Sequence, residues 1–187
     1  MNFPITYHNN FFKDPNKIVS FAKQVGFEKF KNINNVEITR SKCFSLINPD
    51  LFNFISNKLF SIFYDFNLEP VSWQKTGIFF QKTKGEFKER DNNSFRHNDK
   101  DSVLSGIIYL NKETNLDLGT TFYDKEDIIC KFSSYFNSLL MYDGSIDHTI
   151  TSNNKDIRLS IICFIDILQS KQTPLTRSER VNLNYDF

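Results

Sequence analysis

The chain has 187 residues, enough for a single domain with a substantial hydrophobic core. Its 23 Lys and Arg residues against 22 Asp and Glu give a formal net charge of +1 at pH 7, so it lacks the basic excess that nucleic acid or an anionic membrane attracts. No apolar run approaches the roughly 20 residues that span a bilayer, so we expect no membrane-spanning helix.

The cysteines and the first residues bear on the cellular compartment. Cys43, Cys130 and Cys163 form no Cys-x-x-Cys pair and leave an odd one out, a pattern typical of a reducing cytoplasm. The first eight residues contain neither a charged leader nor an apolar stretch, so we expect no signal peptide. The sequence therefore predicts a cytoplasmic protein.

Residues 1–70 are expected to form a mainly helical support region. After a short strand within residues 3–12, Asp14 followed by Pro15 predicts a helix start, because Asp can cap free N–H groups and Pro is tolerated at the first helical position. Asn48 followed by Pro49 predicts a second start. Apolar residues recur at helical spacing after both, which indicates two amphipathic helices packed on the outside of a sheet.

Residues 71–168 have the pattern of a β-rich core. Short apolar runs with brief polar turns and no helix between them favour a sandwich or barrel. The expected strands cover residues 71–81 (as one or two strands), 103–111, 120–123, 138–142, 146–151 and 157–165. Polar residues 84–94 predict a surface loop that opens onto the functional site, and residues 169–187 are expected to form a tail or a lid.

Two of the three histidines and an aspartate form a candidate metal site. A His-x-Asp pair such as His97-x-Asp99 often arises by chance in a chain with 22 acidic residues. Here, however, it stands at a predicted strand edge, where positions i and i+2 share one face, and His148 follows on a later strand. Two imidazoles and one carboxylate form the facial triad that leaves open positions on Fe(II).

Arg158 is the second candidate feature, because it opens an otherwise apolar strand. The turn at residues 153–156 predicts that this strand is the hairpin partner of the His148 strand. An arginine that faces a barrel interior needs an anionic partner, and a carboxylate held by two hydrogen bonds is a suitable one. Ser160 faces the same side and can add a hydroxyl hydrogen bond.

Each of these residues also has an ordinary structural interpretation. His97 and Asp99 fit an exposed loop, and His148 fits a turn cap with Asp147. Arg158 fits a salt bridge at a strand end, with a nearby aspartate at position 156 as partner. It is the combination of all four residues, in this order on a β scaffold, that favours the metal site.

Over roughly residues 71–166, the sequence resembles the 2-oxoglutarate/Fe(II)-dependent dioxygenase superfamily, in particular its small prolyl-hydroxylase-like branch. The motifs that carry the resemblance are His97-x-Asp99, Tyr109-Leu110-Asn111, Gly119-Thr120-Thr121-Phe122, His148 and Arg158-x-Ser160. The resemblance implies a double-stranded β-helix, or jelly roll, with N-terminal α-helices, formed by the chain 1–187 as one domain.

The resemblance also implies a role for each site residue. His97, Asp99 and His148 would bind Fe(II), and Arg158 would pair with the far carboxylate of 2-oxoglutarate, helped by Ser160 and the hydroxyl of Tyr109. Many collagen-type prolyl hydroxylases have Lys at the Arg158 position, so the chain is similar to the arginine-using members. Halogenating relatives lack the carboxylate ligand that Asp99 supplies here, and the second arginine of base-demethylating relatives is absent.

The expected activity is hydroxylation of an unactivated C–H bond, with O2 as oxidant and release of succinate and CO2. The substrate would be an amino acid, a peptidyl side chain or a small metabolite, and nucleic acid is not favoured. A non-catalytic metal- or ligand-binding jelly roll is the main alternative, although an inward Arg158 without a carboxylate would be costly. A cupin-type enzyme that uses iron without 2-oxoglutarate would need more histidines than this chain supplies.

Basic residues near the site have two interpretations, since they can bind a carboxylate substrate or form ordinary solvated surface. They are Lys84, Lys88, Arg90 and Arg96 in the loop 84–96, and Arg177 and Arg180 in the tail.

Overall fold

The computed structural model describes residues 3–33, 36–68, 70–85, 96–113, 118–151 and 157–170, with the backbone alone at 31–33. The elements of this part of the chain, in order, are β1 (Thr6–His8), α1 (Pro15–Ala22), β2 (Glu28–Ile33), β3 (Val36–Arg40), α2 (Phe44–Ile47), α3 (Pro49–Ser61), β4 (Ser72–Lys84), β5 (Leu104–Tyr109), β6 (Gly119–Asp124), β7 (Asp127–Ser133), β8 (Leu139–Asp143), β9 (Asp147–Thr151) and β10 (Arg158–Gln169).

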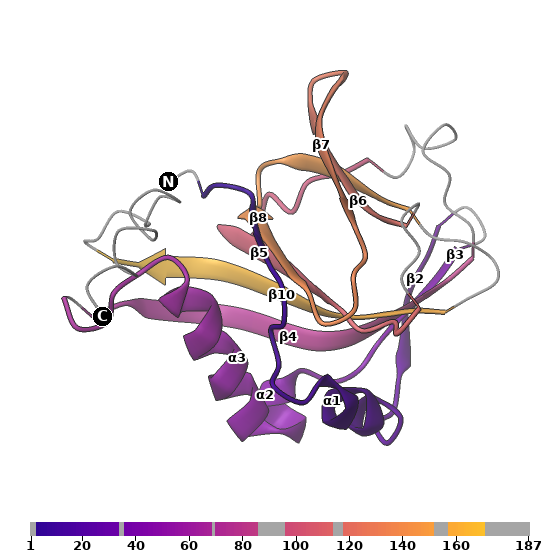
Figure 1. Cartoon of the computed structure of the whole chain (residues 1–187), viewed down its shortest axis with the longest axis horizontal. Coiled ribbons are helices and arrows are strands. Elements are labelled where there is room, and N and C mark those ends of the chain that lie inside the picture. The colour runs from indigo at the N-terminus through magenta and orange to yellow at the C-terminus, as the bar shows by residue number, and fades with distance from the viewer. Residues whose placement is uncertain are drawn as a thin grey trace.

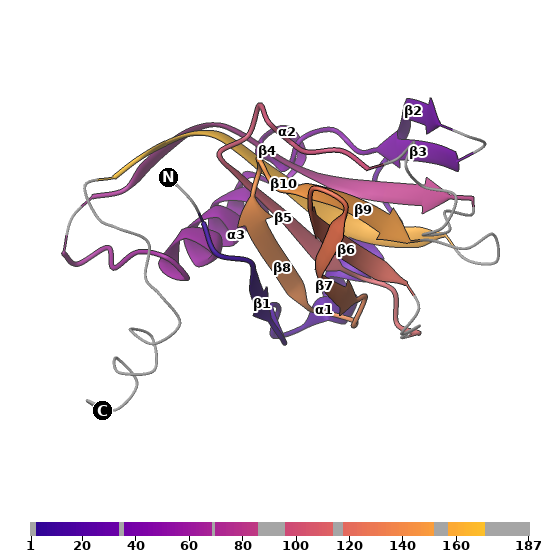
Figure 2. The same ribbon diagram turned by 90° about the horizontal axis from the view of Figure 1, so that it is seen from above.

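The strands form two antiparallel sheets. The major sheet has the order β1-β8-β5-β10-β4-β3-β2, and the minor sheet has the order β7-β6-β9. Figure 1 shows the helices along one face of the major sheet and β6 and β7 on the opposite side. In Figure 2, the long strands β4 and β10 curve side by side across the molecule. The predicted jelly roll with flanking helices is therefore confirmed.

Both predicted helix starts are confirmed by their capping hydrogen bonds. Asp14 Oδ1 accepts a hydrogen bond from the Lys17 amide at 3.3 Å, and Asn48 Oδ1 accepts one from the Leu51 amide at 3.0 Å. A proline follows each cap at the start of α1 and α3. These contacts satisfy amides that have no partner within the helix, which explains where both helices begin.

Strand alternation divides the interior into two hydrophobic layers. On β10, Ile161, Cys163 and Ile165 face the helices and join a core with α2, α3 and the adjacent strands. The alternate residue Ile162 faces the minor sheet, where it packs in a second cluster with Tyr109, Phe122 and Tyr142. Arg158 and Ser160 lie on the same face of β10 as Ile162. They therefore point between the sheets, where the predicted site residues lie.

The structure also differs from the sequence-based expectations. The predicted hairpin between the strands of His148 and Arg158 is wrong: β9 pairs with β6 in the minor sheet, whereas β10 lies between β5 and β4 in the major sheet. Consecutive strands β9 and β10 therefore belong to different sheets. Strands β2, β3 and β7 were not expected, and β2 and β3 extend the sheet from within the 1–70 region.

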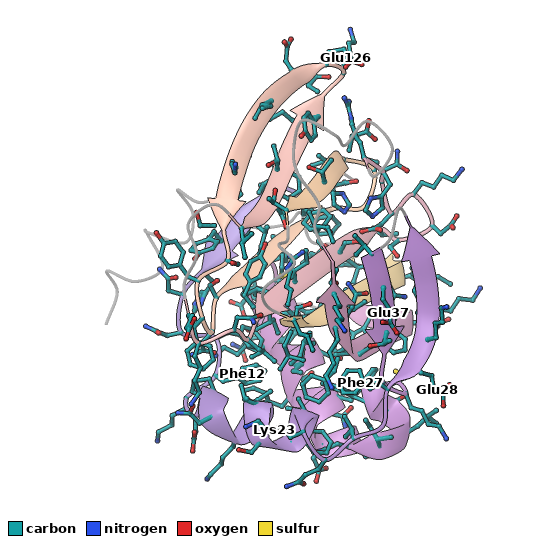
Figure 3. The ribbon with its side chains drawn as sticks, turned by 90° about the vertical axis from the view of Figure 1, so that its right-hand side faces the viewer. Phe12, Lys23, Phe27, Glu28, Glu37 and Glu126 are labelled. Carbon is teal, nitrogen blue, oxygen red and sulfur yellow. The ribbon has the colours of Figure 1, made fainter. Side chains whose placement is uncertain are left out.

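Figure 3 shows the molecule from the side. Glu126 marks the tip of the β6–β7 hairpin. This tip lies at one end of the molecule, and the helices lie at the other end, near the labelled Phe12 and Lys23.

Most of the tail 169–187 and of the loop 84–96 lies outside the described residues, including Lys88, Arg90, Arg177 and Arg180. Within the described part of the chain, no helix has the length and apolarity required to span a membrane.

Candidate metal centre

The backbone brings His97 and His148 side by side. His97 N donates to His148 O at 3.0 Å, and His148 N donates to His97 O at 2.8 Å, which forms an isolated antiparallel bridge between the segment before β5 and strand β9. Asp99 lies outside any strand, where its amide donates to Gly144 O at 2.8 Å. Asp99 therefore does not share a strand face with His97, contrary to the prediction from their i, i+2 spacing, and its position depends on the turn after β8.

The three side chains converge as the sequence motif suggested. His97 Nε2 lies 3.8 Å from Asp99 Oδ1, and His148 Nε2 lies 3.8 Å from Asp99 Oδ2. One potential ligand atom from each residue lies within 4.8 Å of the other two, and the two imidazole rings are 4.4 Å apart between centroids. Two nitrogens and one carboxylate oxygen thus face a common point, as a metal ion requires.

His148 is held in the form that a metal ligand needs. It is 2% exposed, and its Nδ1 lies 3.1 Å from Ile146 O, which can only accept a hydrogen bond. The Nδ1 proton therefore points at the backbone, and Nε2 presents its lone pair to the cluster. Burial, and then the nearby His97, lower the pKa of His148 to about 4, so the imidazole is neutral at pH 7.

A hydrogen-bond network beside the triad stabilises the antiparallel bridge between His97 and His148. Arg96 Nε and Nη2 donate to Asp147 Oδ2 at 3.2 and 3.1 Å, and Asn98 Nδ2 donates to Asp147 Oδ1 at 2.8 Å. The hydrogen bond from Asn98, followed by the contacts with Arg96, lowers the pKa of Asp147. Since Arg96 and Asn98 flank His97 while Asp147 precedes His148, the network joins the two segments that carry the imidazoles.

Tyr142 connects the triad to Arg158. The Tyr142 hydroxyl donates to Asp99 Oδ2 at 3.3 Å and lies 3.2 Å from His148 Nε2. Burial, and then the negative charge of Asp99, raise the pKa of Tyr142 well above its ordinary value, while the charge of Arg158 opposes this shift. The sequence placed Tyr142 in an apolar strand and offered no signal of this role, because its partners come from other segments.

Arg158 is buried between the sheets without a paired carboxylate among the described residues. It is 6% exposed, its Cζ lies 5.2 Å from the Tyr109 ring centroid, and its buried Nε has no hydrogen-bond partner. Burial lowers the pKa of Arg158, and the nearby Tyr109 and Tyr142 oppose this shift. The alternative partner, Asp156, lies outside the described residues.

Polar groups surround this guanidinium. Tyr109 OH lies 2.8 Å from Thr120 Oγ1, and Ser160 pairs in register with Tyr109. Thr83, which belongs to no recognisable sequence motif, pairs in register with Arg158 and has a buried Oγ1 with no hydrogen-bond partner. Buried polar atoms are normally hydrogen-bonded, so Arg158 Nε and Thr83 Oγ1 are two groups that an added acceptor atom would satisfy.

A cleft of about 530 Å³ opens at the triad. Its lining includes His97, Asp99 and His148, together with Arg40 and Gln81 from the major sheet. Apolar side chains complete the wall: Ile38, Ile107, Ile150, Ile162 and Phe164. This combination of an apolar wall and a few convergent polar groups is typical of a small-molecule site.

Comparison with known proteins identifies the fold. No family model and no curated protein sequence matches the chain. Among solved structures, a Pseudomonas putida prolyl-4-hydroxylase matches with TM-score 0.56 and 12% identity, covering 87% of this chain and 91% of that one. A Trichoplax adhaerens prolyl hydroxylase, solved with a hypoxia-inducible-factor peptide, matches with TM-score 0.60 and 14% identity, over 87% and 83% of the two chains.

A third match comes from nogalamycin biosynthesis. The non-heme α-ketoglutarate-dependent epimerase SnoN matches with TM-score 0.60 and 10% identity, covering 94% of this chain and 91% of that one. The chain therefore has the fold of the 2-oxoglutarate/Fe(II) oxygenases, including their prolyl-hydroxylase-like branch, as the sequence resemblance implied.

Proposed function

We propose that this protein is an Fe(II)- and 2-oxoglutarate-dependent oxygenase that hydroxylates a C–H bond of an amino acid, a peptidyl side chain or a small metabolite. The observation that carries the proposal is the convergence of His97, Asp99 and His148 on one point at the edge of a cleft. This donor set is the facial triad of non-heme Fe(II) oxygenases.

The residues present fit both iron and its cosubstrate. His97, Asp99 and His148 would hold Fe(II), with His148 already neutral and its Nε2 facing the cluster. Arg158 would bind the far carboxylate of 2-oxoglutarate with Ser160 and Tyr109, and we add Thr83 to this set. The unsatisfied Arg158 Nε and Thr83 Oγ1 support this assignment, because a carboxylate would supply the acceptors that they lack.

When bound, Fe(II), 2-oxoglutarate and O2 would supply the oxidising power for hydroxylation, with succinate and CO2 as coproducts. The protein's own contribution is to bind and orient. Arg158 would anchor the far carboxylate of the cosubstrate by a charge-assisted contact, while Asp147, through Arg96 and Asn98, keeps the two imidazoles in register. The apolar cluster around Phe122 and Ile162 excludes water from the space between the sheets.

The decisive measurement is succinate release in the presence of Fe(II) and 2-oxoglutarate, with a panel of amino acids and peptides as substrates. We expect release to depend on both additions and to fall to the protein-free level in His97→Ala and Asp99→Ala. His8→Ala is the matched control, since the third histidine lies on β1, outside the described metal cluster. It should retain both turnover and metal stoichiometry.

A non-catalytic metal- or ligand-binding jelly roll remains the alternative to be tested. Such a protein would bind Fe(II) through the same three residues but release no succinate with any member of the panel. Metal binding without 2-oxoglutarate turnover would therefore overturn the proposed activity.

A further inference from the structure

Arg40 is a second inward-facing arginine, and it lines the same cleft as the candidate metal centre. It is the last residue of β3, and both it and Gln81 line the cleft that contains the triad. Arg40 pairs in register with Gln81, and its Nε donates to Gln81 Oε1 at 2.9 Å. This hydrogen bond fixes the plane of the guanidinium and leaves the Nη1–Nη2 edge for another partner.

Aromatic rings hold the Arg40 guanidinium from several sides. Its Cζ lies 3.6 Å from the ring centroid of Phe30, 5.3 Å from that of Phe164 and 5.9 Å from that of Phe79. Cation–π contact stabilises and orients the cation but does not neutralise it. Among the described residues no carboxylate forms an ion pair with Arg40. Burial lowers the pKa of Arg40 to about 10, against the opposing charge of Asp99, so the side chain is still a cation at pH 7.

The other charged groups of the cleft are either engaged or exposed. Arg96 is engaged by Asp147, and Asp99 faces the two imidazoles and Tyr142. Lys100 and Asp101 are exposed to solvent. Arg40 is therefore the half-buried cation of the described cleft that has an oriented hydrogen-bonding edge and no anion against it.

We propose that Arg40, oriented by Gln81, is a subsite for a carboxylate of the substrate, so that the molecule that is hydroxylated is an organic acid, with the free carboxylate of an amino acid or a peptide end as the favoured form. This inference rests on the proposed function. A bidentate carboxylate on the Nη edge would supply the missing anion. The carbon skeleton would lie along the apolar wall, which includes Ile150 and Phe164, and would extend towards the triad.

The two arginines then have separate tasks. Arg158 is buried between the sheets and does not line the cleft, whereas Arg40 lies in its wall. The first would take the cosubstrate carboxylate and the second the substrate carboxylate. This division makes Arg40 a determinant of specificity, because a neutral analogue would leave its charge unpaired.

The test uses the full chain with Mn(II) as a redox-inert replacement for Fe(II), saturated with 2-oxoglutarate. The probes are N-acetyl-leucine, N-acetyl-proline and N-acetyl-phenylalanine, each as the free acid and as the carboxamide. Paramagnetic broadening of probe NMR signals reports binding near the metal without turnover. We expect the acids to bind about tenfold or more tightly than the amides, as for a charge-assisted hydrogen-bonded pair.

Variants separate the Arg40 charge from its packing. Arg40→Met keeps the aliphatic stem and should abolish the preference for acids, whereas Arg40→Lys keeps the charge and should retain part of it. Lys100→Met, which removes an exposed cation from the same cleft, is the matched control and should preserve the preference. Titration of each variant with Mn(II) and 2-oxoglutarate verifies that the metal and cosubstrate sites are intact.

Each other outcome contradicts the inference in a distinct way. Equal binding of acids and amides to the wild type, or no binding of either, overturns the carboxylate subsite, as does an acid preference that survives in Arg40→Met. If Arg40→Met loses 2-oxoglutarate instead, Arg40 serves the cosubstrate and the division of tasks is wrong. Failure of the wild type to bind Mn(II) and 2-oxoglutarate would contradict the proposed function itself.

Discussion

At the scale of single residues, Thr83 carries a buried polar atom that no group in the described part of the chain satisfies. Its Oγ1 is buried beside Arg158 without a hydrogen-bond partner, an arrangement that costs stability unless a ligand completes it. The sequence could not reveal this, because a threonine in a strand usually indicates only β propensity. His97, Asp99, His148 and Arg158 were recognisable because metal and carboxylate chemistry restricts residue types to a few.

The expected consequence is that Thr83→Val separates stability from ligand affinity. The valine methyl replaces a hydroxyl that has no partner, so the free energy of unfolding without ligand should stay within about 0.5 kcal/mol or rise. The Kd for 2-oxoglutarate should increase by about three- to tenfold, as for one lost hydrogen bond. Urea denaturation and calorimetric titration measure the two quantities.

Thr76→Val is the control for this prediction. Thr76 lies on the same strand and also has a buried Oγ1 without a hydrogen-bond partner. Its side chain lies on the opposite face of β4, with Ile78 and Phe80, which pack against the helices. Its replacement should leave the Kd for 2-oxoglutarate unchanged. Equal effects of the two substitutions on 2-oxoglutarate binding would remove Thr83 from the site.

At the scale of elements, the turn after β8 positions the carboxylate of the triad. Gly144 O accepts the Asp99 amide at 2.8 Å, and an added Cβ at Gly144 would lie 1.9 Å from Ser102 O and 2.7 Å from Asp99 O. No side chain fits against these backbone atoms. Gly144 falls between the expected strands 138–142 and 146–151, but only the fold shows which segment packs against it.

Gly144→Ala is therefore expected to weaken both the fold and the metal site. Forcing the turn away from the Asp99 segment should cost about 1–3 kcal/mol of unfolding free energy, with a parallel loss of Mn(II) affinity. Thermal denaturation and metal titration provide the measurements. Gly26→Ala, where an added Cβ meets no atom within 4 Å, should leave the Mn(II) affinity unchanged. Unaltered metal affinity in Gly144→Ala would show that this turn does not position Asp99.

Other elements show where local pattern is sufficient and where it fails. The starts of α1 and α3 were predictable because a cap and a proline act within a few residues. Strand β7 was not predicted. It is an edge strand of the minor sheet with mostly exposed residues, so its sequence lacks the usual alternation of apolar and polar residues. The hairpin assigned to β9 and β10 was wrong because a polar turn has the same local signal whether it joins two paired strands or crosses between sheets.

At the scale of the whole molecule, the site lies between two sheets that the ligands would bridge. The triad joins β9 of the minor sheet to the segment before β5 of the major sheet, and Arg158 opens β10 in the middle of the major sheet. Ligands would bind these groups only in the folded chain, where the two sheets bring them together. Binding should therefore raise the free energy of unfolding of the entire fold.

Thermal denaturation should show this coupling. Mn(II) and 2-oxoglutarate together, with the cosubstrate at about 100 times its Kd, should add about 2.7 kcal/mol and raise the Tm by about 5–10 °C. In Asp99→Ala the increase should disappear, because the carboxylate ligand is missing. A Tm that responds equally in the wild type and in Asp99→Ala would mean that the ligands bind elsewhere.

The sequence alone was sufficient to predict the class of fold, the beginnings of two helices and the residues of a candidate metal and carboxylate site. Those properties depend on residue chemistry and on neighbours within a few positions. Only the tertiary structure decided which sheet carries each strand, that Tyr142 and Thr83 lie beside the predicted residues, and that Arg40 shares the cleft with the triad. These proximities depend on strand order and register, which bring together side chains from segments far apart in the chain.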